Sequence, residues 1–170
     1  MIARPYNARF VPSATSMAAA LELRSVRDLR ERVGQEVVVS AWLEITQERI
    51  DRFADATEDR QWIHVDAARA RRESPFQTTV AHGFLTLSML SLLLNSSIKF
   101  GAAKMGVNYG FNRLRFTAPV PAGSRVRGRF TLRALEEIEG GVQTTWAVVV
   151  EREGSDKPCL VAEWVTRRYD

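Results

Sequence analysis

The spacing of apolar and polar residues divides the chain into a helical first half and a strand-rich second half. Apolar and polar positions alternate with a period of two in four segments, residues 107–116, 125–136, 142–151 and 158–168. Such alternation is typical of strands that bury one face. The segments are separated by Pro119, Pro121 and Gly123, by Gly140 and Gly141, and by Gly154 and Ser155, which are residues that favour turns. The pattern therefore predicts an antiparallel meander.

The first half carries the helical patterns. Residues 83–94 are apolar almost all round, and a helix of this kind is expected to be buried. Thr46 is placed to cap a second, amphipathic helix in which Ile50, Phe53 and Ala54 recur at helical spacing. We also expect a short helix over 23–33, a strand over 37–42 and a loop over 73–79. The fold class is α+β, with an antiparallel sheet wrapped around a long central helix.

Length and composition fit one globular domain over residues 21–170. The chain has 170 residues, of which 45% are hydrophobic, enough for one substantial core but cramped for two. Residues 1–20 contain no acidic residue and show no periodicity, so we expect a flexible N-terminal extension. Its alternatives are a reading frame that naturally starts at Met17, a faint transit-peptide character, and an arm that straps a partner.

The basic balance of the chain does not indicate nucleic-acid binding. The net charge is +4 with a pI near 9.7, but basic and acidic residues are mixed along the sequence. The densest basic set, Arg125, Arg127, Arg129 and Arg133, alternates with apolar residues and predicts the outer face of a half-buried strand. No apolar run reaches the ~18 to 20 residues that span a bilayer. Contacts with nucleic acid and with membranes are therefore not expected.

A single cysteine excludes a disulfide within the chain and a cysteine-rich zinc site. Cys159 lies in an apolar run and is expected to be a buried thiol in a reducing cytoplasm.

Candidate chemistry is concentrated between residues 59 and 83. Asp59 and His64 stand five residues apart just after the amphipathic helix. A carboxylate and a neutral imidazole can hold and orient a water molecule between them, and either could remove its proton. Gly83 begins the apolar helix, where free N–H groups and the helix dipole favour an oxygen that gains negative charge. We expect His82 to be structural at the helix entrance and Asp66 to cap a short helix over 67–71.

These motifs resemble the MaoC/NodN-like (R)-specific enoyl-CoA hydratases, over about residues 33–168. The family pattern is Asp-x-x-x-x-His followed by His-Gly, which here is Asp59, His64, His82 and Gly83. Three later segments carry the same resemblance: Asn108-Tyr109-Gly110, Arg115-Phe116-Thr117-Ala118-Pro119-Val120-Pro121 and Gly123-Ser124-Arg125-Val126.

The chain departs from the hydratase pattern at Gln61 and Trp62, where that family commonly has Asn-Pro. We interpret these two residues as part of the acyl pocket. Ser91 falls where the resembling hydratases place a helix serine near the active site, although a bond to its own helix backbone is the simpler interpretation.

The resemblance implies a hot-dog fold and a cytoplasmic homodimer that acts in fatty acid metabolism. It implies reversible addition of water to a trans-2-enoyl-CoA, giving an (R)-3-hydroxyacyl-CoA. Coenzyme A is present only as part of the thioester substrate, and neither a metal nor a redox cofactor is expected, because the thioester itself makes C2 acidic.

Two other functions stay open at this point. In a hot-dog thioesterase the same pair would direct water at the carbonyl carbon, and thiol release would reveal it. A non-catalytic acyl-CoA-binding module has no chemical reason to retain both Asp59 and His64.

Overall fold

A computed structural model describes residues 20–101 and 103–169 of the chain. The expectation of a flexible extension falls almost entirely on residues outside this description. The helices are η1 (Val26–Arg32, a 3-10 helix), α1 (Gln47–Thr57), α2 (Trp62–Val65), α3 (Ala67–Glu73) and α4 (Gly83–Asn95). The strands are β1 (Leu21–Leu23), β2 (Glu36–Val39), β3 (Leu43–Glu44), β4 (Ile98–Phe100), β5 (Met105–Phe116), β6 (Arg125–Ile138), β7 (Gly141–Arg152) and β8 (Leu160–Tyr169).

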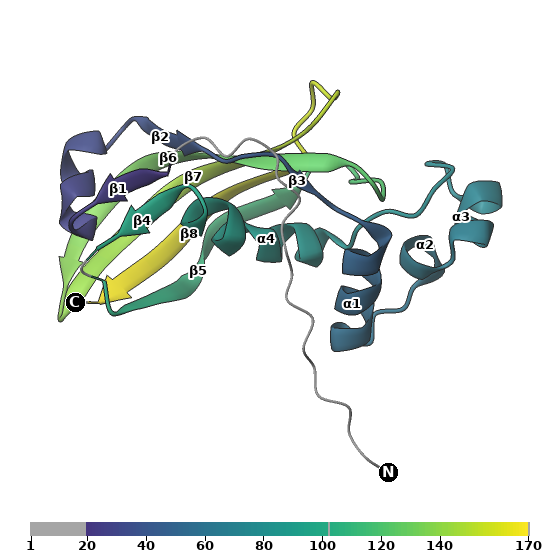
Figure 1. Cartoon of the computed structure of the whole chain (residues 1–170), viewed down its shortest axis with the longest axis horizontal. Helices are drawn as coiled ribbons and strands as arrows, with labels where there is room; N and C mark the ends of the chain where they lie inside the picture. The colour runs from purple at the N-terminus through teal and green to yellow at the C-terminus, as the bar shows by residue number, and fades with distance from the viewer. Residues whose placement is uncertain (1–19, 102, 170) are drawn as a thin grey trace, which may run out of the picture.

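The main sheet is antiparallel and lies along α4 (Figure 1). Its strand order is β2-β6-β7-β8-β5, and β3 also pairs with β6, while β1 and β4 form a separate parallel pair. The four long strands agree with the predicted segments to within two residues at each end. The antiparallel sheet along a central helix is therefore confirmed, but the meander holds only for β6, β7 and β8. The first predicted strand, β5, does not pair with β6, the next strand along the chain; it lies at the far edge of the sheet, beside β8.

Strand alternation produces the core. One face of β6 and β7 points inward and contributes Val126, Phe130, Leu132, Val142, Trp146, Val148 and Val150. Leu85, Leu90, Leu93 and Leu94 of α4 pack into the same core. Gly128 allows this close approach, since a Cβ there would lie 3.5 Å from the Leu93 Cβ and 2.6 Å from the Phe130 ring.

The expectation that α4 is buried all round is wrong for this single chain. Phe84 is 65% exposed, Leu92 is 44% exposed, and Ser88 between them is exposed as well. These positions are four residues apart and therefore share one face of the helix. That face has no cover among the described residues.

Two predictions for the N-terminal part need correction. Residues 23–33 are not one helix: the first of them ends β1, and the helix begins only after Ser25, which caps it through a reciprocal bond with Asp28. The predicted strand over 37–42 is interrupted after Val39. At Ser40 the backbone N–H still donates to the Gly128 carbonyl at 2.8 Å, but the Gly128 N–H donates to the Ser40 hydroxyl at 2.9 Å, and the next strand, β3, begins only at Leu43.

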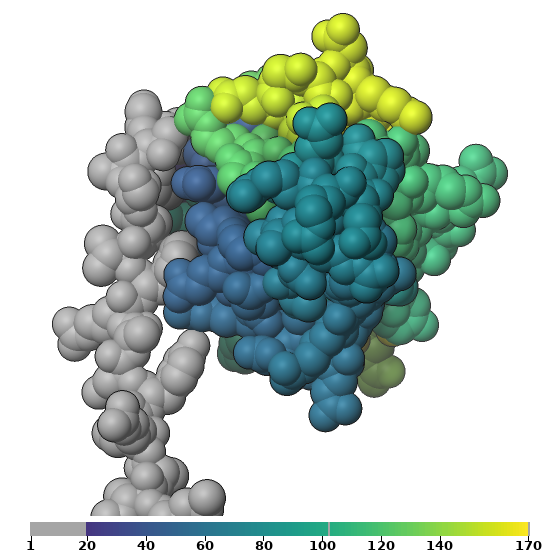
Figure 2. All heavy atoms as spheres, turned by 90° about the vertical axis from the view of Figure 1, so that its right-hand side faces the viewer, coloured from purple at the N-terminus to yellow at the C-terminus, as the bar shows by residue number. Residues whose placement is uncertain are grey.

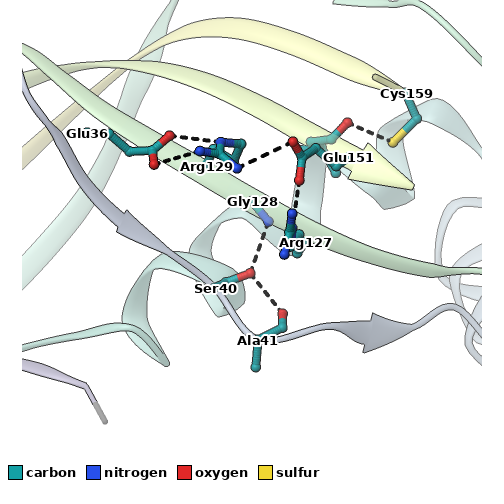
Figure 3. Close-up of polar contacts among 9 residues, drawn as sticks. Glu36, Ser40, Ala41, Arg127, Gly128, Arg129, Glu151 and Cys159 are labelled. Atoms are coloured by element: carbon teal, nitrogen blue, oxygen red, sulfur yellow. Dashed lines mark hydrogen bonds and ion pairs between the residues drawn. The ribbon is translucent and has the colours of Figure 1, made fainter. Parts of the chain in front are cut away.

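The arginine face of β6 is a set of ion pairs with neighbouring strands (Figure 3). Arg127 Nε lies 2.6 Å from a Glu151 oxygen, and Arg129 donates to both Glu36 oxygens at 2.7 and 2.8 Å. Arg125 is paired with Glu153 in the same way. These guanidinium groups are committed to carboxylates, which agrees with a strand surface rather than an anion-binding patch.

Two smaller predictions are confirmed. Cys159 is 2% exposed, and its burial raises the thiol pKa to about 11, so the side chain is an unreactive thiol. Asp66 caps α3 by accepting from the Arg69 N–H at 2.9 Å. In the described part of the chain, no helix is both long and apolar enough to cross a membrane.

Helices α1, α2 and α3 gather at one end of the sheet, beside the start of α4 (Figures 1 and 2). This arrangement brings the two predicted catalytic side chains to the N-terminus of α4.

Candidate active site

Asp59 and His64 lie on the connection that leaves α1. The helix ends at Glu58, which adopts a left-handed conformation with φ 61°, and the chain then turns back toward α4. Asp59 follows in the turn with a side chain that is 57% exposed, whereas His64 sits on the single turn of α2 and is 8% exposed. A solvent-facing carboxylate thus stands beside a buried imidazole.

The hydrogen bonds of His64 define its tautomer. Its Nδ1 lies 2.6 Å from the carbonyl oxygen of Val80, and a carbonyl can only accept, so Nδ1 carries the proton. Nε2 is then an unprotonated acceptor. Burial lowers the pKa of His64 from its ordinary value, opposed by the Val80 hydrogen bond; His82 lowers it further, and Asp59 raises it. The ring is therefore neutral at pH 7, as a general base must be.

His82 stacks on His64 at the entrance of α4. The two ring centroids are 3.7 Å apart and the planes are inclined by 26°. His82 Nε2 donates to the backbone carbonyl of Asp59 at 2.8 Å, so His82 holds the turn that carries the carboxylate. This bond agrees with the structural role predicted for His82. Its Nδ1 is buried and has no hydrogen-bond partner among residues 20–101 and 103–169.

The three side chains form a compact cluster, but its geometry suits a metal ion poorly. One potential ligand atom from each of Asp59, His64 and His82 lies within 4.8 Å of the others. His64 Nδ1 and His82 Nε2 each carry a proton, which they donate in a hydrogen bond to a backbone carbonyl, so neither nitrogen can bind a metal ion. The remaining ring nitrogens lie in stacked planes, so no single ion can lie in the plane of both rings.

Gly83 opens α4 next to a cavity of about 310 Å³. The cavity is lined by Ala81, Gly83, Thr86, residues 116–120 and Cys159. A Cβ at Gly83 would lie 2.9 Å from the Phe116 ring. Glycine therefore allows this ring to lie directly against the start of α4. Phe116, which the sequence marked only as part of a strand motif, thus forms one wall at the helix N-terminus.

Ser91, Gln61 and Trp62 lie outside this cavity wall. Ser91 does not bond its own helix backbone; its hydroxyl accepts from the Asn108 side chain of β5 at 3.1 Å. The Trp62 ring is half-buried, with the Arg69 guanidinium 4.4 Å from its centroid. Gln61 is exposed and accepts the His64 N–H through its carbonyl at 2.9 Å. The proposed pocket role of Gln61 and Trp62 stays a prediction.

A residue that the sequence did not single out also belongs to this region. Gln47, on the first turn of α1, donates to the backbone carbonyl of His64 at 2.8 Å and accepts from the hydroxyl of Thr79. Its sequence position looks like that of any polar residue on a solvated helix face. No local pattern in the sequence could have identified it.

Comparisons with known proteins identify the family of the chain. The chain is 49% identical over 144 residues to the 3-hydroxyacyl-thioester dehydratase Z of Mycobacterium tuberculosis, covering 84% of this chain and 95% of that protein. It is 49% identical over 145 residues to nodulation protein N of Rhizobium leguminosarum bv. viciae, covering 84% and 89%. The solved (R)-hydratase from A. caviae involved in PHA biosynthesis superposes with a TM-score of 0.60 at 25% identity, covering 79% and 94%. The family model described as MaoC like domain matches residues 28–153, and the chain belongs to this family.

Proposed function

We propose that this protein catalyses the reversible addition of water to a trans-2-enoyl-CoA, which yields an (R)-3-hydroxyacyl-CoA. The observation that carries the proposal is the His64 tautomer. Its Nδ1 is bound to Val80, so Nε2 is left as the unprotonated nitrogen, and the His64 ring and the Asp59 carboxylate have potential ligand atoms within 4.8 Å of each other. The names of the relatives, a 3-hydroxyacyl-thioester dehydratase and an (R)-hydratase, support the substrate class and the stereochemistry.

In the proposed mechanism, Asp59 and His64 hold the attacking water between them. His64 Nε2 removes one proton as the hydroxide adds to C3, and the electrons of the double bond move toward the thioester carbonyl. The Gly83 N–H stabilises the oxygen that gains charge, an effect on the order of 3 kcal/mol for one donor of this kind. The imidazolium then returns its proton to C2, which restores His64. Dehydration follows the same steps in reverse.

The protein is proposed to work without a metal or redox cofactor. The thioester supplies the acidity of C2, and the base and the donor of the proposed mechanism are side-chain and backbone groups of the chain itself.

We further propose that the active form is a homodimer joined through the β5 side of the molecule. β5 is the edge strand of the main sheet, and an unpaired edge is a liability unless it is covered. Large apolar side chains are exposed along β5 and on the neighbouring face of α4: Met105, Val107, Tyr109, Phe111, Phe116, Phe84 and Leu92. Phe84 and Phe116 contact each other beside Gly83, so this surface reaches the proposed site.

A direct assay tests the proposed reaction. The purified protein is incubated with trans-2-enoyl-CoA while the enone absorbance and free thiol are followed together. We expect the absorbance to fall without thiol release, and chiral analysis to give the (R)-3-hydroxyacyl product. Stoichiometric thiol release would instead identify a thioesterase, and an unchanged substrate that still binds would identify a binding module.

A further inference from the structure

Gln47 joins three segments that are distant in the sequence and meet around His64. Its side-chain Nε2 lies 2.8 Å from the His64 carbonyl oxygen and 2.7 Å from an Asp51 carboxylate oxygen. Its Oε1 accepts a hydrogen bond from the Thr79 hydroxyl. One amide therefore contacts α1, α2 and the strand-like segment before α4.

The orientation of this amide is fixed by its partners. A backbone carbonyl and a carboxylate can only accept, so the NH2 group must face His64 and Asp51. The hydroxyl of Thr79 is then the donor to Oε1. Thr79 is 1% exposed, so the link is protected from water. Both ends of the amide are used, and the amide cannot be flipped without leaving acceptors facing each other.

The same three segments hold the His64 ring. Val80, the neighbour of Thr79, accepts from His64 Nδ1 at 2.6 Å, and its own N–H donates to Ile63 at 3.0 Å. Gln47 binds the His64 backbone on one side and Thr79 on the other. It thereby fixes the distance between the imidazole and the Val80 carbonyl that selects its tautomer.

We propose that Gln47 is a positioning residue of the active site, which clamps His64 against the Thr79 segment so that Nδ1 stays on Val80 and Nε2 faces the substrate. This inference rests on the proposed function for its kinetic consequence, but not for its structural one. Small misplacement of a catalytic group can cost about a hundredfold in rate. Gln47 itself contacts neither the attacking water nor the substrate; it acts through His64.

The decisive variant is Gln47→Glu, which keeps the size of the side chain and removes its only donors. The new carboxylate would face the His64 carbonyl and the Asp51 carboxylate, so the clamp opens. Gln143→Glu is the matched control, because Gln143 is also half-buried and its amide also both donates, to Glu136, and accepts, from Arg167. Thr79→Val removes the hydroxyl that donates to Gln47 and so tests the other end of the clamp. Thr79→Ser keeps that hydroxyl and should leave the clamp intact.

Two readouts separate the inference from the proposed function. The first is kinetic: we expect Gln47→Glu and Thr79→Val to lower kcat at least about tenfold with KM changed less than about threefold, while Thr79→Ser and Gln143→Glu stay near wild type. The second is the 15N spectrum of the imidazoles, which reports the tautomer without any substrate. The chain has two histidines, so a His82→Gln background assigns His64 unambiguously.

In the spectrum we expect a single Nδ1–H tautomer of His64 in the wild type and a mixture in Gln47→Glu and Thr79→Val. Thermal unfolding identifies any variant that has lost its fold, and the clamp is then judged on the folded one. If both folded variants keep the wild-type tautomer and kcat, the clamp is refuted even when the wild type hydrates enoyl-CoA. If the wild type shows no hydration but the tautomer changes as expected, the clamp stands and the proposed reaction fails.

Discussion

His64 and His82 stack face to face, with ring centroids 3.7 Å apart, and each ring donates one hydrogen bond to a backbone carbonyl. His64 binds Val80 and His82 binds Asp59, so the pair connects α2, the start of α4 and the turn after α1. A protonated ring would face a second imidazole at close range. Burial and the neighbouring ring both lower the pKa of His64, so His64 is neutral at rest, as the proposed mechanism requires.

The first prediction concerns the catalytic pair. Asp59→Asn and His64→Ala should each lower the hydration rate at least about a hundredfold, because a positioned acid or base contributes that much or more. Circular dichroism and thermal unfolding should show that both variants remain folded. A variant that keeps more than about a tenth of the activity at wild-type stability would remove that residue from the mechanism.

The second prediction concerns the pH dependence of activity. Replacing His82 by glutamine removes a neighbour that lowers the His64 pKa, while the ring of His64 stays on Val80. The acid limb of kcat against pH should therefore move to higher pH. Asp66→Asn is a suitable control, since it alters a cap on α3 without touching either ring. An unchanged acid limb in His82→Gln would show that the stack does not tune His64.

The pH dependence of folding stability should also reflect the titration of His64. The pKa of His64 is lowered in the folded state, chiefly by burial, so the unfolded chain binds a proton more readily. The stabilisation is complete above the ordinary histidine pKa of about 6.5 and is lost as pH falls through the lower, folded-state value. Urea unfolding at pH 7.5 and at pH 5 should show a larger loss for the wild type than for His64→Ala. Equal losses would mean that His64 is not responsible.

Most of the fold could be predicted because its strands are long and half-buried. Alternation over ten or more residues, as in β6 and β7, is a strong signal, and the short glycine turns between β6, β7 and β8 indicate that these strands are neighbours. The position of β5 beside β8 could not be predicted, because a strand pattern does not show which strand it pairs with. β1 and β4 have three residues each, which is too short for any periodicity to register. The exposed face of α4 was missed for another reason: an apolar pattern shows that a surface is covered, but not whether its own chain covers it.

The site was predictable only where its residues are close in the sequence. Asp59 and His64 are five residues apart, and His82-Gly83 marks a helix start, so these could be identified locally. The Val80 carbonyl that sets the tautomer is sixteen residues from His64, and Thr79 is thirty-two residues from Gln47. Such contacts arise from the packing of separate segments and leave no pattern in the sequence.

Gly83 provides a test of the helix N-terminus. In Gly83→Ala the new Cβ would lie 2.9 Å from the ring of Phe116, which is 44% exposed and able to move outward. We expect the fold to survive, while the approach of the thioester to the helix N–H is blocked and kcat/KM falls by about tenfold or more. Ser88→Ala on the exposed face of the same helix is the control. Normal activity in Gly83→Ala would remove the oxyanion role from this backbone group.

The homodimer is tested by placing a charge on the exposed edge strand. Val107 on β5 is 37% exposed, and a lysine on a sheet edge discourages pairing with another strand. Val107→Lys should shift the protein from dimer to monomer in sedimentation, with a dissociation constant raised at least about tenfold. Val33→Lys is the matched control, because Val33 is 44% exposed but follows η1, away from β5. Since Phe84 and Phe116 place the exposed apolar surface next to Gly83, activity should fall with the dimer fraction and recover at high protein concentration. A wild-type protein that sediments as a stable, active monomer would contradict the proposed interface and leave the exposed β5 side chains without a role.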